Sequence, residues 1–207
     1  MTTKSSASSS SSLVNQLLRD DETTAVFIDG MNLYSASKAL EFNLDYRKIL
    51  DLFNSRGRMI RAFYYTAIVE QEGSSSSESG GPGYTPIKPL VDWLEYNGYT
   101  TRTKIAKDHI DQNGRRRIKG NMDIELAIDM LEISEHIDHA ILFSGDGDFK
   151  KLVETVQRKG VRVTIISTLR SPSPMVSDDL RRQADCFFDL IDLIPLISRQ
   201  PERPRVD

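Results

Sequence analysis

The segment ILFSGDGDF, Ile141–Phe149, carries the most structural information in this chain. Its apolar start predicts a buried strand, because a short apolar run bounded by glycine signals is typical of a strand in a sheet interior. Two aspartates, Asp146 and Asp148, follow between glycines. In open α/β sheets, ligands bind outside the carboxyl ends of the strands. We therefore expect both carboxylates at the edge of a binding site.

A purely structural explanation competes with this one, since the two aspartates can cap a turn and the following helix by accepting hydrogen bonds from free backbone N–H groups. A second segment, TAVFIDGMNLY (Thr24–Tyr34), has the same design. There, a predicted strand is followed by Asp29 and Asn32. Two strand ends with acidic residues favour a functional site over two independent caps.

Strand and helix patterns alternate along the chain, which predicts βαβ units in a single α/β domain with a mainly parallel, Rossmann-like sheet and helices on both faces. The predicted strands are 25–29, 59–66, 100–106, 140–143, 161–167 and 186–189, and the predicted helices are 46–54, 87–97, 122–134, 149–159 and 176–184.

The composition is that of one ordinary globular domain with tails, since 39% of the 207 residues are apolar and 28% are charged. The single cysteine, Cys186, excludes an internal disulfide framework and a cysteine-rich zinc site. The apolar runs are too short for a membrane-spanning helix, and a serine run stands where a secretion signal has its apolar core. We therefore expect a cytoplasmic protein without a membrane partner.

Low-complexity segments set the expected domain bounds. We expect residues 1–22 to be a disordered serine-rich arm and lead-in, residues 23–195 to be the folded domain, and residues 196–207 to be a tail. The tract GSSSSESGGPG, residues 73–83, is expected to be a flexible loop within the domain, either a tolerated insertion or a lid.

Positive charge is concentrated between Arg102 and Lys119, where seven basic residues and two acidic ones give +5 in a chain of net charge −3. The dipeptide Asn113-Gly114 is a strong hairpin turn, so this stretch is expected to be a protruding antiparallel ribbon or an ordered loop. Arginine and lysine neutralise phosphates in nucleic-acid complexes. The residues expected to guide a nucleic-acid strand are Arg115, Arg116, Arg117 and Lys119.

Three motifs, in this order, resemble the signature of NYN domains of the LabA-like branch, which are relatives of the PIN-domain nucleases: FIDGMN (Phe27–Asn32), KGNMD (Lys119–Asp123) and SGDGDF (Ser144–Phe149). The later stretch SDDLRRQADCFFDL, Ser177–Leu190, resembles the closing helix and strand of that family. The resemblance covers about residues 23–195. It implies a compact PIN-like sheet whose acidic residues bind Mg²⁺ or Mn²⁺ at the carboxyl edge for phosphodiester cleavage, usually of RNA.

Matched motif by motif, the resemblance assigns catalysis and metal binding to Asp29, Asp123, Asp146 and Asp148, with Asp29 and Asp146 as the preferred direct ligands. Asn32 matches the family's asparagine after the first strand, expected to orient Asp29 or to contact substrate. Without the resemblance, Asp123 is better explained as a first-turn carboxylate favoured by the helix dipole than as a functional residue, and the resemblance reverses that order.

The chemistry of these residues agrees with the assignment. Mg²⁺ prefers carboxylate oxygens and retained water and needs no sulfur or imidazole ligand. Carboxylates held close together raise one another's pKa unless a cation neutralises them. A cluster of four therefore predicts either a divalent ion or a strained, partly protonated site without one, and the ion is the simpler explanation.

Other polar residues are given structural roles. Glu125 and Asp129 are expected to be solvated or to support the site, and Tyr64 and Tyr65 are expected in the core in preference to stacking on bases. The three histidines, His109, His136 and His139, are expected to be ordinary surface residues.

We therefore predict a metal-dependent endoribonuclease acting on single-stranded RNA, and a homodimer is compatible with the sequence. The alternative from another class is an RNA-binding or regulatory protein that keeps the acidic cluster with negligible turnover. A haloacid-dehalogenase-like phosphatase needs a second aspartate where Met31 stands. A dinucleotide-binding domain needs a G-x-G-x-x-G after the first strand, and FIDGMN does not provide it.

Overall fold

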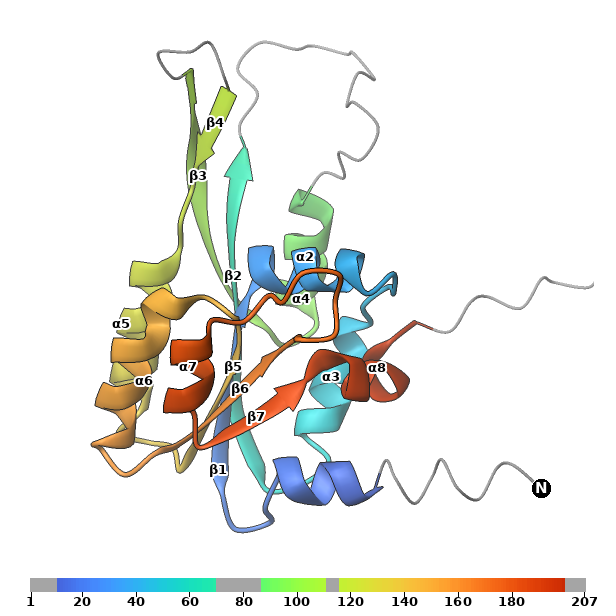
Figure 1. Cartoon of the computed structure of the whole chain (residues 1–207), viewed down its shortest axis with the longest axis vertical. Helices are drawn as coiled ribbons and strands as arrows, with labels where there is room; N and C mark the ends of the chain where they lie inside the picture. The colour runs from blue at the N-terminus through green and yellow to red at the C-terminus, as the bar shows by residue number, and fades with distance from the viewer. Residues whose placement is uncertain (1–10, 70–86, 111–115, 200–207) are drawn as a thin grey trace, which may run out of the picture.

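A seven-stranded sheet forms the centre of the molecule in the computed structural model, which describes residues 11–69, 87–110 and 116–199, with the backbone alone at residues 69, 107–110 and 116–119 (Figure 1). The strand order is β4-β3-β2-β1-β5-β6-β7. The strands are β1 (Thr23–Asp29), β2 (Arg58–Val69), β3 (Thr100–Ile110), β4 (Arg116–Lys119), β5 (His139–Phe143), β6 (Arg162–Ser167) and β7 (Cys186–Asp189).

All neighbouring strands are parallel except β4, which pairs antiparallel with β3. Taken in chain order, the six parallel strands have the arrangement 3-2-1-4-5-6, which is the doubly wound Rossmann order. Successive strands are added outward on one side of β1 up to β3, and from β5 on they are added on the other side. The strand order therefore reverses between β1 and β5, which are parallel neighbours with Ile28 paired to Phe143. This confirms the predicted α/β class and places a topological switch point between the two strands that carry the aspartates.

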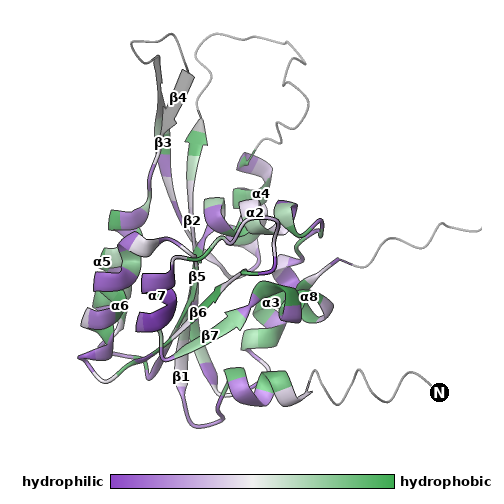
Figure 2. Cartoon of the chain, viewed as in Figure 1, coloured by the Kyte–Doolittle hydropathy of each residue, from purple (hydrophilic) through white to green (hydrophobic). Residues whose placement is uncertain are grey.

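Helices cover both faces of the sheet, as predicted (Figures 1 and 2). The helices are α2 (Gly30–Ala39), α3 (Tyr46–Phe53), α4 (Lys88–Tyr96), α5 (Asp123–Ile133), α6 (Lys150–Gln157), α7 (Asp178–Gln183) and α8 (Leu190–Ile197), and a 3-10 turn, η1 (Gly147–Phe149), precedes α6. One core contains side chains of α2, α3, α4 and α8, and the other contains side chains of α5, α6 and α7.

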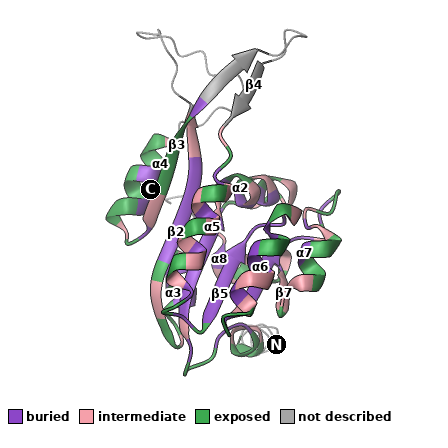
Figure 3. Ribbon diagram, turned by 90° about the vertical axis from the view of Figure 1, so that its left-hand side faces the viewer, coloured by how far each residue is buried: buried purple, intermediate pink, exposed green. Residues whose placement is uncertain are grey.

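The alternation of β1 explains the two cores. Val26 and Ile28 belong to the first core, and Ala25 and Phe27 belong to the second, because successive strand residues point to opposite faces. All four are fully buried, and the central strands are the most buried part of the fold (Figure 3). A strand buried on both faces has to be continuously apolar, which is why the run before Asp29 lacks the alternation of a surface strand.

The packed structure extends beyond the expected bounds at residues 23 and 195. Residues 11–17 are helical, and Leu17 and Leu18 are buried in the first core, so the lead-in is part of the fold. At the other end, residue 195 falls inside α8, whose Ile197 is also fully buried. Helices α2 and α8 and residues 11–17 were missed because their apolar residues stand directly beside a functional motif or a low-complexity tract.

The prediction for His139 was wrong. This residue begins β5 at the amino edge of the sheet and is fully buried. Its ring lies between Thr164 and Arg162. His136 is exposed, as expected, and the side chain of His109 lies outside the described residues.

Within the described part of the chain, no helix combines the length and the apolar character that crossing a membrane requires. The expected flexible loop at residues 73–83 lies outside the described residues.

Candidate metal and nucleic-acid site

The three sequence motifs meet at the carboxyl edge of the sheet. Asp29 is the last residue of β1, and the SGDGD segment directly follows β5, which is the neighbouring strand. Asp123 begins α5, and residues 120–122 connect this helix to the end of β4. Segments that are far apart in the sequence are therefore side by side at the switch point, where α/β sheets bind ligands.

Glycines are required where these segments touch. A Cβ atom at Gly145 would lie 1.7 Å from the carbonyl oxygen of Met175, and one at Gly30 would lie 2.6 Å from the Tyr64 ring. The Gly145 carbonyl also accepts a hydrogen bond of 2.9 Å from the Ser177 backbone N–H. The close backbone approach explains why a glycine separates strand and aspartate in SGDGD.

A hydrogen-bond network fixes the end of β1 to the loop after β5. The two oxygens of Asp29 accept hydrogen bonds from the backbone N–H of Asn32, at 3.1 Å, and from the Ser144 hydroxyl, at 3.0 Å. The Ser144 hydroxyl oxygen in turn accepts from the Asp146 backbone N–H at 3.2 Å. The Asn32 side-chain oxygen accepts from the Gly145 backbone N–H at 3.2 Å. Asn32 thus orients Asp29 through its backbone N–H. Its side chain holds residues 144–148, the segment after β5 that we call the aspartate loop.

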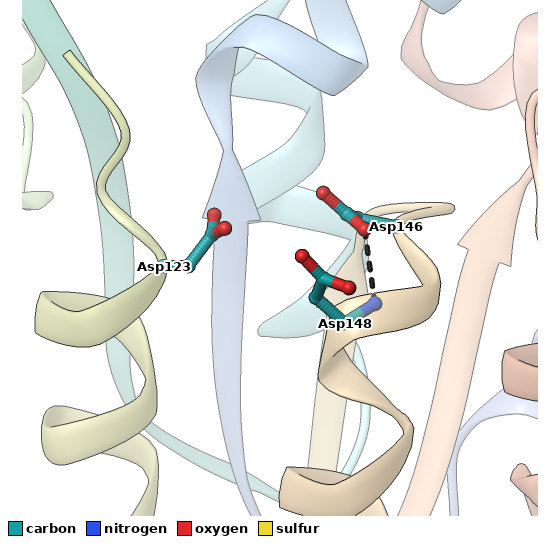
Figure 4. A group of neighbouring side chains, drawn as sticks. All are labelled: Asp123, Asp146 and Asp148. Carbon is teal, nitrogen blue, oxygen red and sulfur yellow. Dashed lines mark hydrogen bonds between the residues drawn. The ribbon is translucent and has the colours of Figure 1, made fainter. Parts of the chain in front are cut away.

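Asp123, Asp146 and Asp148 form a carboxylate cluster, each offering one oxygen within 4.8 Å of the others (Figure 4). One oxygen of Asp146 accepts a hydrogen bond from the Asp148 backbone N–H at 3.0 Å. Asp123 is held by Asn121, whose side-chain oxygen accepts from the Asp123 backbone N–H at 2.7 Å and whose amide donates to the Asp123 carboxylate. Asp146 therefore caps a turn, as the structural explanation predicts, and also faces Asp123 and Asp148, while its role as a metal ligand stays a prediction.

The structure brings three of the four predicted carboxylates into this cluster, and Asp29 lies beside it. Asp29, Asp123 and Asp146 line the same pocket, whose volume is about 330 Å³. Both Asp29 oxygens accept hydrogen bonds from the protein, whereas Asp148 is exposed at the start of η1. The cluster thus contains Asp148 where the sequence preference had Asp29 beside Asp146, and which of these carboxylates bind a metal directly stays a prediction.

The electrostatics of the site fit a cation. Burial raises the pKa of Asp29, and the charges of Asp123 and Asp146 raise it further against the hydrogen bonds from Asn32 and Ser144. Burial also raises the pKa of Asp123, followed by the charges of Asp146, Asp148 and Glu125, while Asn121 lowers it. An all-oxygen donor set with mutual repulsion fits a hard divalent ion such as Mg²⁺ or Mn²⁺.

The backbone of the predicted basic ribbon is seen in the structure. Lys107–Ile110 of β3 pair antiparallel with Arg116–Lys119 of β4. The side chains of Arg116, Arg117 and Lys119 are outside the description, and Arg115 lies outside the described residues altogether.

Two basic residues of the same stretch have structural partners. Arg102 pairs with Asp129 at 2.9 Å, and Lys104 pairs with Glu125 at 2.8 Å. Asp129 also accepts a hydrogen bond of 3.0 Å from the Tyr65 hydroxyl. Glu125 and Asp129 therefore connect α5 to the sheet, a role that spacing within α5 does not reveal because the partners lie on β2 and β3. Tyr64 and Tyr65 are in the core, as expected.

Comparison with known proteins agrees with the motifs. Residues 23–193 match the family model of the NYN domain. The chain is 33% identical over 184 residues, covering 87% of this chain and 89% of the relative, to the low amplitude and bright protein LabA of Synechococcus elongatus. A crystal structure of a protein of unknown function from Vibrio parahaemolyticus superposes with a TM-score of 0.62 at 27% identity, covering 83% of this chain and 94% of that one. The chain therefore belongs to the NYN domain family, within the PIN-like nuclease superfamily.

Proposed function

We propose that the chain is a divalent-metal-dependent endoribonuclease that hydrolyses single-stranded RNA in the cytoplasm, as a monomer or a homodimer. The convergence of Asp123, Asp146 and Asp148 at the switch point of a nuclease-family fold is the observation that carries the proposal. Asp29 completes the acidic set from the pocket wall.

The three clustered carboxylates are the residues that would hold Mg²⁺ or Mn²⁺. When bound, the ion supplies Lewis acidity, which lowers the pKa of a water molecule and neutralises charge on the phosphate. The protein supplies the orientation: Asn121 fixes Asp123, and the turn N–H of Asp148 fixes Asp146. Asp29 positions the aspartate loop through Ser144, so its loss would displace Asp146 as well as remove a charge.

The proposal extends to the basic ribbon. Arg115, Arg116, Arg117 and Lys119 precede Asp123 by four to eight residues, and the pairing of β3 with β4 keeps the ribbon at the carboxyl end of the sheet. Their role in the proposal is to neutralise the RNA backbone, which supplies affinity independent of sequence.

The test is cleavage of short single-stranded RNA and DNA, labelled at either end, with Mg²⁺, Mn²⁺ or EDTA. We expect internal cleavage of RNA with either metal and none with EDTA. Asp123→Asn, Asp146→Asn and Asp148→Asn should each lower the rate by about 100- to 1,000-fold, which is the usual effect of removing one group that stabilises transition-state charge. Asp92→Asn, an exposed position on α4, is the matched control and should retain the full rate.

Cleavage that survives Asp146→Asn would identify a contaminating nuclease. RNA binding without cleavage under any metal would favour the regulatory alternative. In the binding arm of the experiment, replacing Arg115, Arg116 and Arg117 with alanine should flatten the slope of log affinity against log salt by about 2 units, at about 0.7 per phosphate contact on a single strand. The double alanine variant of Arg58 and Arg61, exposed arginines at the amino end of β2, should leave that slope unchanged.

A further inference from the structure

Helix α2 presents a stripe of four side chains that its packing does not explain. Met31, Tyr34, Ser35 and Lys38 have the spacing i, i+3, i+4 and i+7, which places them on one face of the helix. The opposite face packs in the core through buried residues that include Leu33 and Ala36. Met31 is 64% exposed and Tyr34 is 44% exposed, although both are large hydrophobic side chains.

The stripe begins inside the carboxylate pocket. Met31 and Ser35 line the same pocket as Asp29, Asp123 and Asp146, and α2 starts at the residue directly after Asp29. From Met31 to Lys38 the stripe is about 10 Å long, at about 1.5 Å per helical residue. At about 3.4 Å per stacked nucleotide, this length corresponds to about three nucleotides.

The far end of the stripe is basic. The Lys38 ammonium lies 5.4 Å from the centre of the Tyr34 ring. Among the side chains that the structure describes, Lys38 forms no ion pair with a carboxylate, unlike Arg102 and Lys104 on the other side of the pocket. A polyanionic strand approaching the aspartates meets repulsion there, and Lys38 supplies an attractive charge next to an exposed aromatic ring.

We propose that this stripe is the track on which single-stranded nucleic acid lies as it enters the carboxylate pocket. Tyr34 stacks on an unpaired base, Lys38 pairs with a phosphate, and Met31 contacts the nucleotide nearest the cluster. Stacking on an aromatic side chain requires a base that is free of its duplex partner, so the track selects single strands. The inference rests on the proposed function for the position of the scissile phosphate, but binding to the track is measurable without cleavage.

The experiment measures equilibrium binding of a fluorescent single-stranded RNA by anisotropy. All variants are made in full-length Asp146→Asn protein with Mg²⁺ present, so that turnover does not interfere. Tyr34→Ala should weaken binding by about 5- to 150-fold, which is the effect of removing one stacking aromatic. Tyr34→Phe should bind within about twofold of the parent, because the ring that stacks is retained. Lys38→Gln should reduce the slope of log affinity against log salt by about 0.7.

Tyr96→Ala is the control for a lost surface tyrosine. Tyr96 is 92% exposed at the end of α4, four residues before β3 begins, and thus lies toward the amino edge of the sheet. It should bind RNA like the parent. Circular dichroism melting of each variant verifies that the fold is intact.

Unchanged affinity in Tyr34→Ala and an unchanged salt slope in Lys38→Gln would overturn the track, even if the wild type cleaves RNA. Equal affinity for duplex and single-stranded RNA would also overturn it. Loss of binding in Tyr34→Ala but not in Tyr34→Phe supports the track, and it does so even if the wild type proves inactive and the proposed nuclease function fails.

Discussion

At the scale of the residue, a single aspartate serves two purposes because a carboxylate has two oxygens. One Asp146 oxygen caps the Asp148 N–H, and the carboxylate also takes part in the cluster. A capping interpretation and a metal-site interpretation of SGDGD are therefore not alternatives. The cap restrains the Asp146 carboxylate in an orientation in which it faces Asp123 and Asp148.

At the same scale, His139 makes the free energy of unfolding depend on pH. Arg162 donates to the His139 Nδ1 atom at 2.9 Å, so that atom carries no proton and Nε2–H donates to the Thr164 hydroxyl oxygen at 2.8 Å. Burial, followed by the charges of Arg162 and Arg19, lowers the pKa of His139 to about 3. The folded protein thus keeps this ring neutral at a pH where the unfolded chain protonates it.

Between pH 6.5 and about 3 the unfolded state therefore binds one more proton at His139 than the folded state. We expect this residue to lower the free energy of unfolding by about 1.4 kcal/mol for each pH unit below 6.5. Urea denaturation at a series of pH values, for the wild type and for His139→Asn, measures it as the difference between the two slopes. His136→Asn, at an exposed position, should reproduce the wild-type slope. Equal slopes for the wild type and His139→Asn would contradict the neutral assignment.

At the scale of the element, α5 has to be held in place because Asp123 is its first residue. Its more buried polar attachment to the sheet is Asp129, which accepts from the Tyr65 hydroxyl on β2 and from Arg102 on β3. Asp129 is mostly buried, with 14% of its side chain exposed, whereas Lys104 and Glu125 form a more exposed pair.

Asp129→Ala should therefore lower the free energy of unfolding by about 1 to 3 kcal/mol, since it leaves the buried Tyr65 hydroxyl without its acceptor. Lys104→Ala should cost no more than about 1 kcal/mol, because exposed ion pairs contribute little. Urea denaturation measures both values. Adding Tyr65→Phe to Asp129→Ala should cost little further, since the unpaired hydroxyl is then gone. A fully additive double variant would show that the two side chains do not act through this hydrogen bond.

At the scale of the whole molecule, the sheet order decides which motifs meet. The reversal between β1 and β5 brings FIDGMN next to SGDGD, and the return of the chain from β4 into α5 adds KGNMD. The fold also includes residues N-terminal to the matched domain. Arg162 donates to the Leu17 carbonyl oxygen at 3.2 Å and pairs with Glu22, so β6 and the start of β1 are tied to residues 11–17.

Leu17→Ala should accordingly lower the free energy of unfolding by about 2 to 5 kcal/mol, the range for truncating a fully buried leucine. Asn15→Ala, an exposed position on the same helical segment, should change it by no more than about 0.5 kcal/mol. Thermal or urea denaturation compares them. A Leu17→Ala protein as stable as the wild type would mean that the domain is complete at residue 23.

The sequence by itself determined the α/β class, the alternation of strands and helices, the family and the identity of the acidic residues. These depend on local patterns: continuous apolar runs before an aspartate, turn residues, and motifs in a given order. Even so, helix α2 was not predicted. The spacing of Met31, Tyr34, Ser35 and Lys38 is recognised as one face of a helix only when Leu33 and Ala36 are known to be buried on the opposite face.

The tertiary structure decided what depends on contacts between distant segments. It placed Asp148 and Asp123 with Asp146 and left Asp29 on the pocket wall, it buried His139, and it used Arg102 and Lys104 to hold α5. The physical reason is the same in each case. A side chain's partners are set by strand order and register across the sheet, and neither is written in the spacing of residues along one segment.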